Sequence, residues 1–239
     1  MTAFEAGPLR VHAAGGSDRR GGGDGPAIVL CHGFGAPGDD LVSLARVIDA
    51  GPGVRWFFPE APLELRLGFG VAGRAWWEID MARLEQLMRR ADVQQLIQDT
   101  PAGLAEARAA LEACIDALVR DHGVARDRMI LGGFSQGAMV SSEVALHAAQ
   151  PFVGLVLLSG ALISADRWAL AARVTGPSLR VLMTHGRADP LLPFEGAEML
   201  RALLEGAGAS VEWAPHNGQH EIPELACDRF AAFARARLG

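Results

Sequence analysis

The stretch Leu131-Gly132-Gly133-Phe134-Ser135-Gln136-Gly137-Ala138 decides the fold of this 239-residue chain. It contains a G-x-S-x-G pentapeptide centred on Ser135. The short run 128–131 before it is mostly apolar and typical of a buried strand, and apolar residues over 138–146 recur at helical spacing. A serine between a strand and a helix sits on a sharp, strained turn that exposes its hydroxyl above the sheet. The sequence therefore predicts a nucleophile at Ser135, with a glycine on either side because the turn leaves little room.

The same turn predicts where a negatively charged oxygen would be held. A helix that begins after Ser135 points its unpaired N–H groups at the nucleophile, and the N–H of Gln136 is the first of them. A second donor is expected from the loop after an early strand. Phe34, which lies between glycines in His32-Gly33-Phe34-Gly35, fits that position. We expect Phe34 and Gln136 to form an oxyanion hole.

The amino-acid composition favours a globular protein and gives no reason to expect a nucleic-acid-binding or membrane protein. Half of the residues are hydrophobic and 21% are charged, which is typical of one packed α/β domain over residues 1–239. The net charge of −6 gives no electrostatic reason to expect a nucleic-acid partner or an anionic membrane. No stretch has the length and apolarity of a transmembrane segment or a signal peptide, so we expect a cytoplasmic protein. The oligomeric state is left open, a homodimer included.

Residue usage also limits the chemistry. The chain contains no tyrosine and no lysine, which excludes a P-loop lysine, a pyridoxal phosphate Schiff base and Ser-Lys or Tyr-Lys pairs. The base that activates Ser135 must then be His, Asp or Glu. The three cysteines, Cys31, Cys114 and Cys227, form no C-x-x-C pair, and we expect them to be small buried hydrophobes.

Apolar runs alternate with helical stripes along most of the chain. This rhythm predicts a mostly parallel sheet flanked by helices. The predicted strands are 8–13, 27–31, 53–58, 128–131, 152–158, 179–184 and 210–213. The predicted helices are 39–50, 101–122, the one after Ser135, a short one around Trp168, 194–205 and 221–238.

Residues 61–100 interrupt the rhythm, and we interpret them as a lid-like insertion that contains a helix over 81–90. The apolar part from 63 to 77 is expected to line an acyl pocket, with Leu65, Trp76 and Trp77 as substrate-binding residues; ordinary core packing is the alternative. Residues 68–73 match G-x-G-x-x-G, but no helix pattern comes after them, so a dinucleotide site is not predicted.

The orienting carboxylate should follow a late strand, because functional groups of doubly wound sheets collect at the carboxyl ends of the strands. Asp189 lies just beyond the strand that ends at Thr184, and Asp166 lies one strand earlier. We favour Asp189, since it follows the later strand and lies nearest the histidine loop in the sequence, within the chain order Ser, Asp, His of α/β-hydrolases. Asp166 remains the alternative.

Two histidines compete for the role of base. His216 and His220 both lie in the loop after the strand ending at Trp213. His220 directly precedes the last helix, from where its ring can reach Ser135, and we favour it on position. His32 and His185 are expected to shape strand ends.

These motifs together resemble the phospholipase/carboxylesterase family, which includes acyl-protein thioesterases, lysophospholipases and small bacterial carboxylesterases. The resemblance covers about 27–239. It rests on L-C-H-G-F-G (30–35), A-W-W-E-I-D (75–80), G-G-F-S-Q-G (132–137), T-H-G-R-A-D-P-L-L-P (184–193) and Q-H (219–220).

The resemblance implies an α/β-hydrolase fold and a serine carboxylesterase for a small-molecule ester of short to medium acyl chain. It implies Ser135, Asp189 and His220 as the triad, Phe34 and Gln136 as oxyanion donors, and no metal or organic cofactor. The sequence departs from the thioesterases in a longer 81–100 segment and in Glu221 after the histidine. Thioesterase or lysophospholipase activity and a catalytically silent binding protein are the alternatives.

Overall fold

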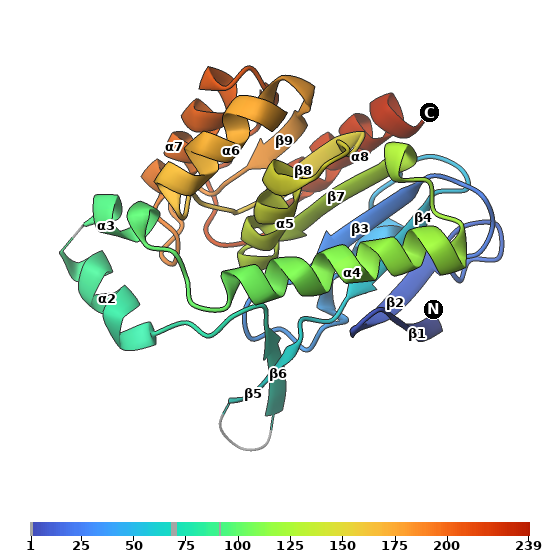
Figure 1. Ribbon diagram of the computed structural model, residues 1–239, viewed down its shortest axis with the longest axis horizontal. Coiled ribbons are helices and arrows are strands. Elements are labelled where there is room, and N and C mark those ends of the chain that lie inside the picture. The colour runs from blue at the N-terminus through green and yellow to red at the C-terminus, as the bar shows by residue number, and fades with distance from the viewer. Residues whose placement is uncertain (1, 68–70, 91) are drawn as a thin grey trace.

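The computed structural model describes residues 2–67, 71–90 and 92–239, and an eight-stranded sheet runs through its centre (Figure 1). The strand order is β1-β2-β4-β3-β7-β8-β9-β10. The β1–β2 and β2–β4 pairs are antiparallel, and all the other pairs are parallel. The strands are β1 Thr2–Ala6, β2 Leu9–Gly15, β3 Ala27–Cys31, β4 Arg55–Pro59, β7 Met129–Phe134, β8 Gly154–Leu158, β9 Arg180–Thr184 and β10 Ser210–Trp213.

Helices cover both faces of the sheet, because the inner strands are apolar on both sides. Every residue of β3, β4 and β8 is buried. One face packs against α4 Leu104–His122, α5 Gln136–His147, α6 Ala165–Thr175 and α7 Phe194–Gly206. The other packs against the 3-10 turn Asp40–Ser43, the short α1 Leu44–Val47 and α8 Glu224–Leu238. Further 3-10 turns span Arg126–Arg128 and Gly176–Ser178.

Two hydrophobic cores follow from this layering. Leu111, Val144 and Trp168 belong to the core on the α4–α7 side, and Phe230 and Phe233 to the other. The three cysteines are buried and free, as predicted. In the described part of the chain, no helix has the length and apolarity needed to cross a membrane.

The insertion between β4 and α4 has two parts. An antiparallel hairpin, β5 Leu63–Leu67 with β6 Val71–Ala75, projects from the body in Figure 1. Two helices, α2 Met81–Arg89 and α3 Val93–Gln98, then lie beyond the end of the sheet. Positions 68–70 of the G-x-G-x-x-G match lie outside the described residues, and its remaining positions belong to strand β6 rather than to a helix.

Most predicted elements are confirmed, but helix α3 is not predicted and three further segments differ in kind. The edge strand β1 is not predicted; its sequence TAFEA carries no long apolar run, and only one of its residues is buried. The hairpin is missed although Leu63, Leu65 and Leu67 alternate with charged residues, a two-residue period. The helix expected over 39–50 is two short turns, because the chain becomes extended at Ile48 and the Asp49 carboxylate accepts the Gly51 N–H in a competing turn.

Candidate active site

Ser135 lies on the turn between β7 and α5 in a strained backbone conformation. Its φ of 55° and ψ of −120° lie outside the ordinary regions for a residue with a side chain. The Ser135 N–H donates to the Leu158 carbonyl at 2.9 Å. A Cβ at Gly133 or Gly137 would collide with the backbone of Cys31. The close approach of β3 to the turn, and of Gly133 to the backbone of Gly137, therefore explains both glycines.

Asp189, in the loop after β9, holds His220 by a short hydrogen bond. His220 Nδ1 lies 2.7 Å from Asp189 Oδ2, and the Asp189 side chain is fully buried. The other oxygen, Oδ1, accepts the N–H groups of Leu191 and Leu192 at 2.9 Å each. Burial alone would raise the pKa of Asp189, but these hydrogen bonds outweigh it and hold that pKa below its usual range. The carboxyl group is therefore ionised at neutral pH.

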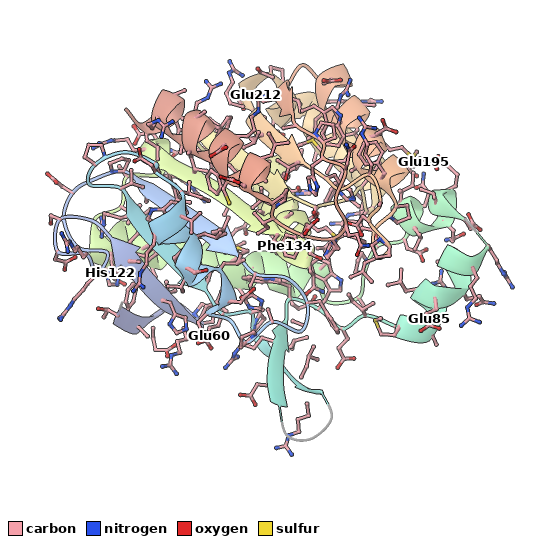
Figure 2. All side chains as sticks on the ribbon, turned by 180° about the vertical axis from the view of Figure 1, so that it is seen from behind. Glu60, Glu85, His122, Phe134, Glu195 and Glu212 are labelled. Atoms are coloured by element: carbon pink, nitrogen blue, oxygen red, sulfur yellow. The ribbon has the colours of Figure 1, made fainter. Side chains whose placement is uncertain are left out.

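An ionised Asp189 fixes the tautomer of His220. The proton stays on Nδ1, and Nε2 keeps a free lone pair, as a general base requires. The imidazole packs against the ring of Phe134, with ring centroids 4.7 Å apart. Phe134, labelled near the middle of Figure 2, directly precedes Ser135. The structure thus brings Asp189, His220 and the serine turn together.

The two competing residues lie in other environments. His216 Nδ1 accepts the N–H of Gly218 at 3.2 Å, within its own loop. Asp166 is exposed in the first turn of α6. Among the described residues, the carboxylate hydrogen-bonded to His220 is that of Asp189. His185 is buried at the end of β9, where Nε2 donates to the Leu192 carbonyl at 3.0 Å, in keeping with a strand-end role.

The two expected oxyanion donors flank the serine. Gln136 is the first residue of α5, so its N–H has no carbonyl of a preceding helical turn to bond. The loop that carries Phe34 lies against the turn, since a Cβ built on Gly33 would be 3.3 Å from the Ser135 Cβ. Both backbone segments therefore border the nucleophile.

A cavity of about 460 Å³ opens beside Ser135. Gln136, Met139 and Trp77 line it next to the serine, and most of its other walls are apolar. The α2 and α3 helices supply Leu84, Leu87, Val93, Leu96 and Ile97, and the loops after β8 and β9 supply Ala161, Leu162, Ile163, Leu191 and Leu192. None of these α2 and α3 residues was predicted to line a pocket, although the helical spacing of the leucines in α2 indicates an apolar helix face.

The three substrate-binding candidates have different positions. Trp77 lines the cavity. Trp76 is buried in the core next to it, where its ring N–H donates to the His32 carbonyl at 3.0 Å. Leu65 is on β5 of the hairpin, and neither Leu65 nor Trp76 is among the cavity-lining residues. Core packing therefore describes Trp76 better than the acyl-pocket role expected from sequence.

The low pKa of Asp189 predicts acid sensitivity of the fold. A carboxyl group whose pKa is lower in the folded state stabilises the protein above its unfolded pKa of about 3.9, and this stabilisation is lost as the pH falls through the folded value. Melting temperatures of wild type and Asp189→Asn should therefore converge as the pH is lowered from 6 to 3. A constant difference across that range would contradict the pKa assignment.

Comparison with known proteins assigns most of the chain to one family. The family model described as Phospholipase/Carboxylesterase matches residues 22–236. Acyl-protein thioesterase 1 of Gibberella zeae is 27% identical over 221 residues, covering 88% of this chain and 90% of that protein. Acyl-protein thioesterase 1 of Yarrowia lipolytica is 27% identical over 197 residues, covering 80% and 82%.

Solved structures show the same fold. Esterase PE8 superposes with a TM-score of 0.77 at 24% identity, covering 96% of this chain and 99% of that one. The Bacillus cereus carboxylesterase superposes with a TM-score of 0.70 at 18% identity, covering 96% and 94%. The predicted α/β-hydrolase fold is confirmed.

Proposed function

The chain belongs to the phospholipase/carboxylesterase family and is a serine hydrolase of the esterase or thioesterase type, and from that premise we propose that it hydrolyses carboxylic esters of short to medium acyl chain. The proposed triad is Ser135, His220 and Asp189. The proposed oxyanion donors are the N–H groups of Phe34 and Gln136. A small-molecule ester is the proposed partner, and a cytoplasmic location stays a prediction.

The proposed reaction passes through an acyl-enzyme. Ser135 Oγ attacks the ester carbonyl while His220 Nε2 takes the serine proton, and the two N–H donors stabilise the oxyanion. When the intermediate collapses, the carbon–oxygen bond to the alcohol breaks and His220 returns the proton to that alcohol. A water molecule, deprotonated by His220, then attacks the acyl carbonyl; the bond between the acyl carbon and Ser135 Oγ breaks, His220 returns the proton to Oγ, and the acid leaves. Asp189 keeps the imidazole in the tautomer that both steps use.

The observation that best supports this proposal is the 2.7 Å bond between Asp189 and His220. It joins two loops that follow different strands, and it orients the imidazole beside a serine whose backbone is strained. A binding protein without catalysis has no use for such an arrangement, because strain and buried charge both cost stability.

Because the cavity beside Ser135 is mostly apolar, we propose that it binds the acyl chain of the substrate. We propose that residues 61–100 are a lid-like insertion in a single domain and that α2 and α3 form the outer wall of the acyl site. The volume of about 460 Å³ lies in the lower half of the range for small-molecule sites, which favours short to medium chains.

Parallel assays test the proposed function. p-Nitrophenyl esters from acetate to decanoate, the matching acyl thioesters and lysophospholipids are compared by kcat/KM, and a fluorophosphonate probe reports the reactive serine. We expect the highest kcat/KM on short to medium esters and labelling at Ser135. A higher kcat/KM on thioesters or lysolipids would select that alternative, whereas no labelling and no turnover would support a silent binding protein.

Truncation of Trp76 and Trp77 in turn should distinguish a pocket residue from a core residue. Trp77→Ala enlarges the cavity, and since one methylene of pocket contact changes discrimination by about 1–3 kcal/mol, the preferred ester should become longer. Trp76→Ala should instead lower the free energy of unfolding by about 3–5 kcal/mol and leave the relative chain-length preference unchanged. A thermal melt and an ester series on each variant measure both effects. An unchanged preference in Trp77→Ala would remove Trp77 from the acyl site.

A further inference from the structure

The segment 74–77, which begins within β6 and continues just beyond it, contacts both backbone segments that carry the proposed oxyanion donors. We propose that this segment, called here the brace, fixes the distance between the Phe34 and Gln136 N–H groups, and that the Gln136 side chain is the positioning residue that attaches it. The inference rests on the proposed function, because it takes those two groups as donors.

The donors need such a support because the sheet does not reach them. Pairing of β3 with β7 ends at Cys31 opposite Gly133, and Phe34 and Gln136 each lie three residues beyond that pair. Both donors must lie within about 2.7–3.1 Å of the same oxygen to stabilise it. A relative shift of a few tenths of an ångström between the two segments would weaken one of the two bonds.

One end of the brace pairs with the Phe34 loop. The Gly35 N–H donates to the Arg74 carbonyl at 2.8 Å, and the Arg74 N–H donates to the Ala36 carbonyl at 2.8 Å. These two bonds tie two consecutive residues of the loop to the backbone of Arg74, and the first involves the residue directly after Phe34. The Phe34 peptide is thereby tied to the insertion.

The other end is held by the Gln136 side chain. The Trp76 N–H donates to Gln136 Oε1 at 2.9 Å, and Gln136 Nε2 donates to the Trp77 carbonyl at 2.9 Å. The side chain is buried, with 1% of the residue exposed, so water does not replace either bond. Gln136 thus offers its backbone N–H to the site and uses its amide group to hold the brace against the same turn.

His32 attaches the middle of the brace to the start of the Phe34 loop. The Trp76 ring N–H donates to the His32 carbonyl at 3.0 Å. The His32 ring donates from Nδ1 to the Gly33 carbonyl at 2.8 Å and accepts the Ala61 N–H at Nε2 at 2.9 Å. Burial lowers the pKa of His32, which keeps the neutral tautomer that this pattern needs.

A partly buried ion pair anchors the side chain of Arg74. Arg74 Nε lies 2.8 Å from Glu60 Oε2, and its Nη1 donates to the Ala61 carbonyl at 3.2 Å. The other oxygen of Glu60 lies 2.8 Å from His12 Nε2. Glu60, labelled in Figure 2, lies beside the start of the hairpin. This pair links the brace to the antiparallel part of the main sheet.

The first test replaces Gln136 by methionine, which keeps the length of the side chain and the backbone N–H but removes both amide bonds. We expect kcat on a short p-nitrophenyl ester to fall about 10- to 100-fold, less than the roughly 10²–10³-fold cost of deleting a donor outright, with little change in KM. Affinity for an alkyl boronic acid, which becomes tetrahedral on Ser135, should fall by a similar factor. Affinity for the product carboxylate should not change.

The matched control is Ser142→Ala on the same helix. Ser142 is buried and its hydroxyl donates to the Ala138 carbonyl at 2.9 Å, away from the brace. Its loss should lower the melting temperature without changing kcat or the ratio of boronic acid to product affinity. If Gln136→Met changes only the melting temperature, as the control does, or if KM and product affinity account for the whole loss, the positioning role is refuted.

A second variant, at the Arg74 end of the brace, tests whether Arg74 and Gln136 act through the same segment. Arg74→Met removes the ion pair, and it also serves if Gln136→Met does not fold. If both act through the brace, the double variant should lose less kcat than the product of the two single losses, because the second change finds the brace already released. Full multiplicativity would mean two independent effects and would contradict the proposal.

Amide hydrogen exchange separates failure of the brace from failure of the proposed function. The Trp76 and Gly35 amides should exchange faster in Gln136→Met than in wild type, whatever substrate the enzyme takes. Unchanged exchange at both amides overturns the brace. Faster exchange in a protein that hydrolyses no ester, thioester or lysolipid would support the brace and refute the proposed function.

Discussion

Ser135→Ala is expected to lower kcat on p-nitrophenyl butyrate by about 10⁴–10⁶-fold, because the acyl-enzyme can no longer form. The turn should persist, since Gly133 and Gly137 still allow the close approach of β3. The melting temperature should therefore stay near that of wild type, and fluorophosphonate labelling should disappear. Initial rates under saturating substrate, with active sites titrated, measure the effect.

The serine variant also tests the assignment of the nucleophile itself. The helix dipole, the oxyanion donors and the acyl cavity remain, so a small residual rate above the uncatalysed reaction is expected from them. Turnover within tenfold of wild type would instead show that another group attacks the ester. The triad proposal would then be abandoned together with the acyl-enzyme.

The second large effect concerns the histidines. His220→Ala should lower kcat by about 10³–10⁶-fold, because the base and its link to Asp189 are both lost. His216→Ala is the matched control in the same loop, and its kcat should stay within about tenfold of wild type, since its ring bonds Gly218 within the loop. Added imidazole should restore part of the activity of His220→Ala alone. An inactive His216→Ala beside an active His220→Ala would reverse the assignment.

The fold could be predicted from sequence because its signals are local. The buried runs around β3, β7 and β8 and the strand–glycine–serine–glycine–helix order each occupy fewer than a dozen neighbouring residues. The boundaries of α4 and α8 differ from the predictions by three residues at their first turns, where Pro101 and Pro223 precede the helices. A proline indicates that a helix begins nearby, but it does not determine which residue makes the first helical hydrogen bond.

Candidate site residues could be predicted from the sequence only where their position along the chain, after particular strands, identified them. Asp189 and His220 were chosen by position after late strands, and the contact between them required the structure. The second use of Gln136 could not be predicted, because its partners Trp76 and Trp77 lie about 60 residues away in the sequence. Nothing in the spacing of a glutamine and two tryptophans encodes that contact. The same reason explains why Trp76 was expected in the pocket.

The helical part of the insertion has one consequence for how this enzyme can diverge. The segment 78–100 is bounded by Trp77 and Leu104, which are both almost fully buried, and within it Ile97 of α3 packs into the main core. Its ends are thus fixed, and the cost of lengthening a chain between fixed ends grows slowly, by about 0.6 kcal/mol for each doubling. Segments of other lengths can therefore be accommodated between these two points at a small entropic cost, provided that they replace the apolar contacts that α3 makes with the body. Under the proposed acyl site, a change in this segment would alter one wall of the cavity and leave the Ser135 turn unchanged.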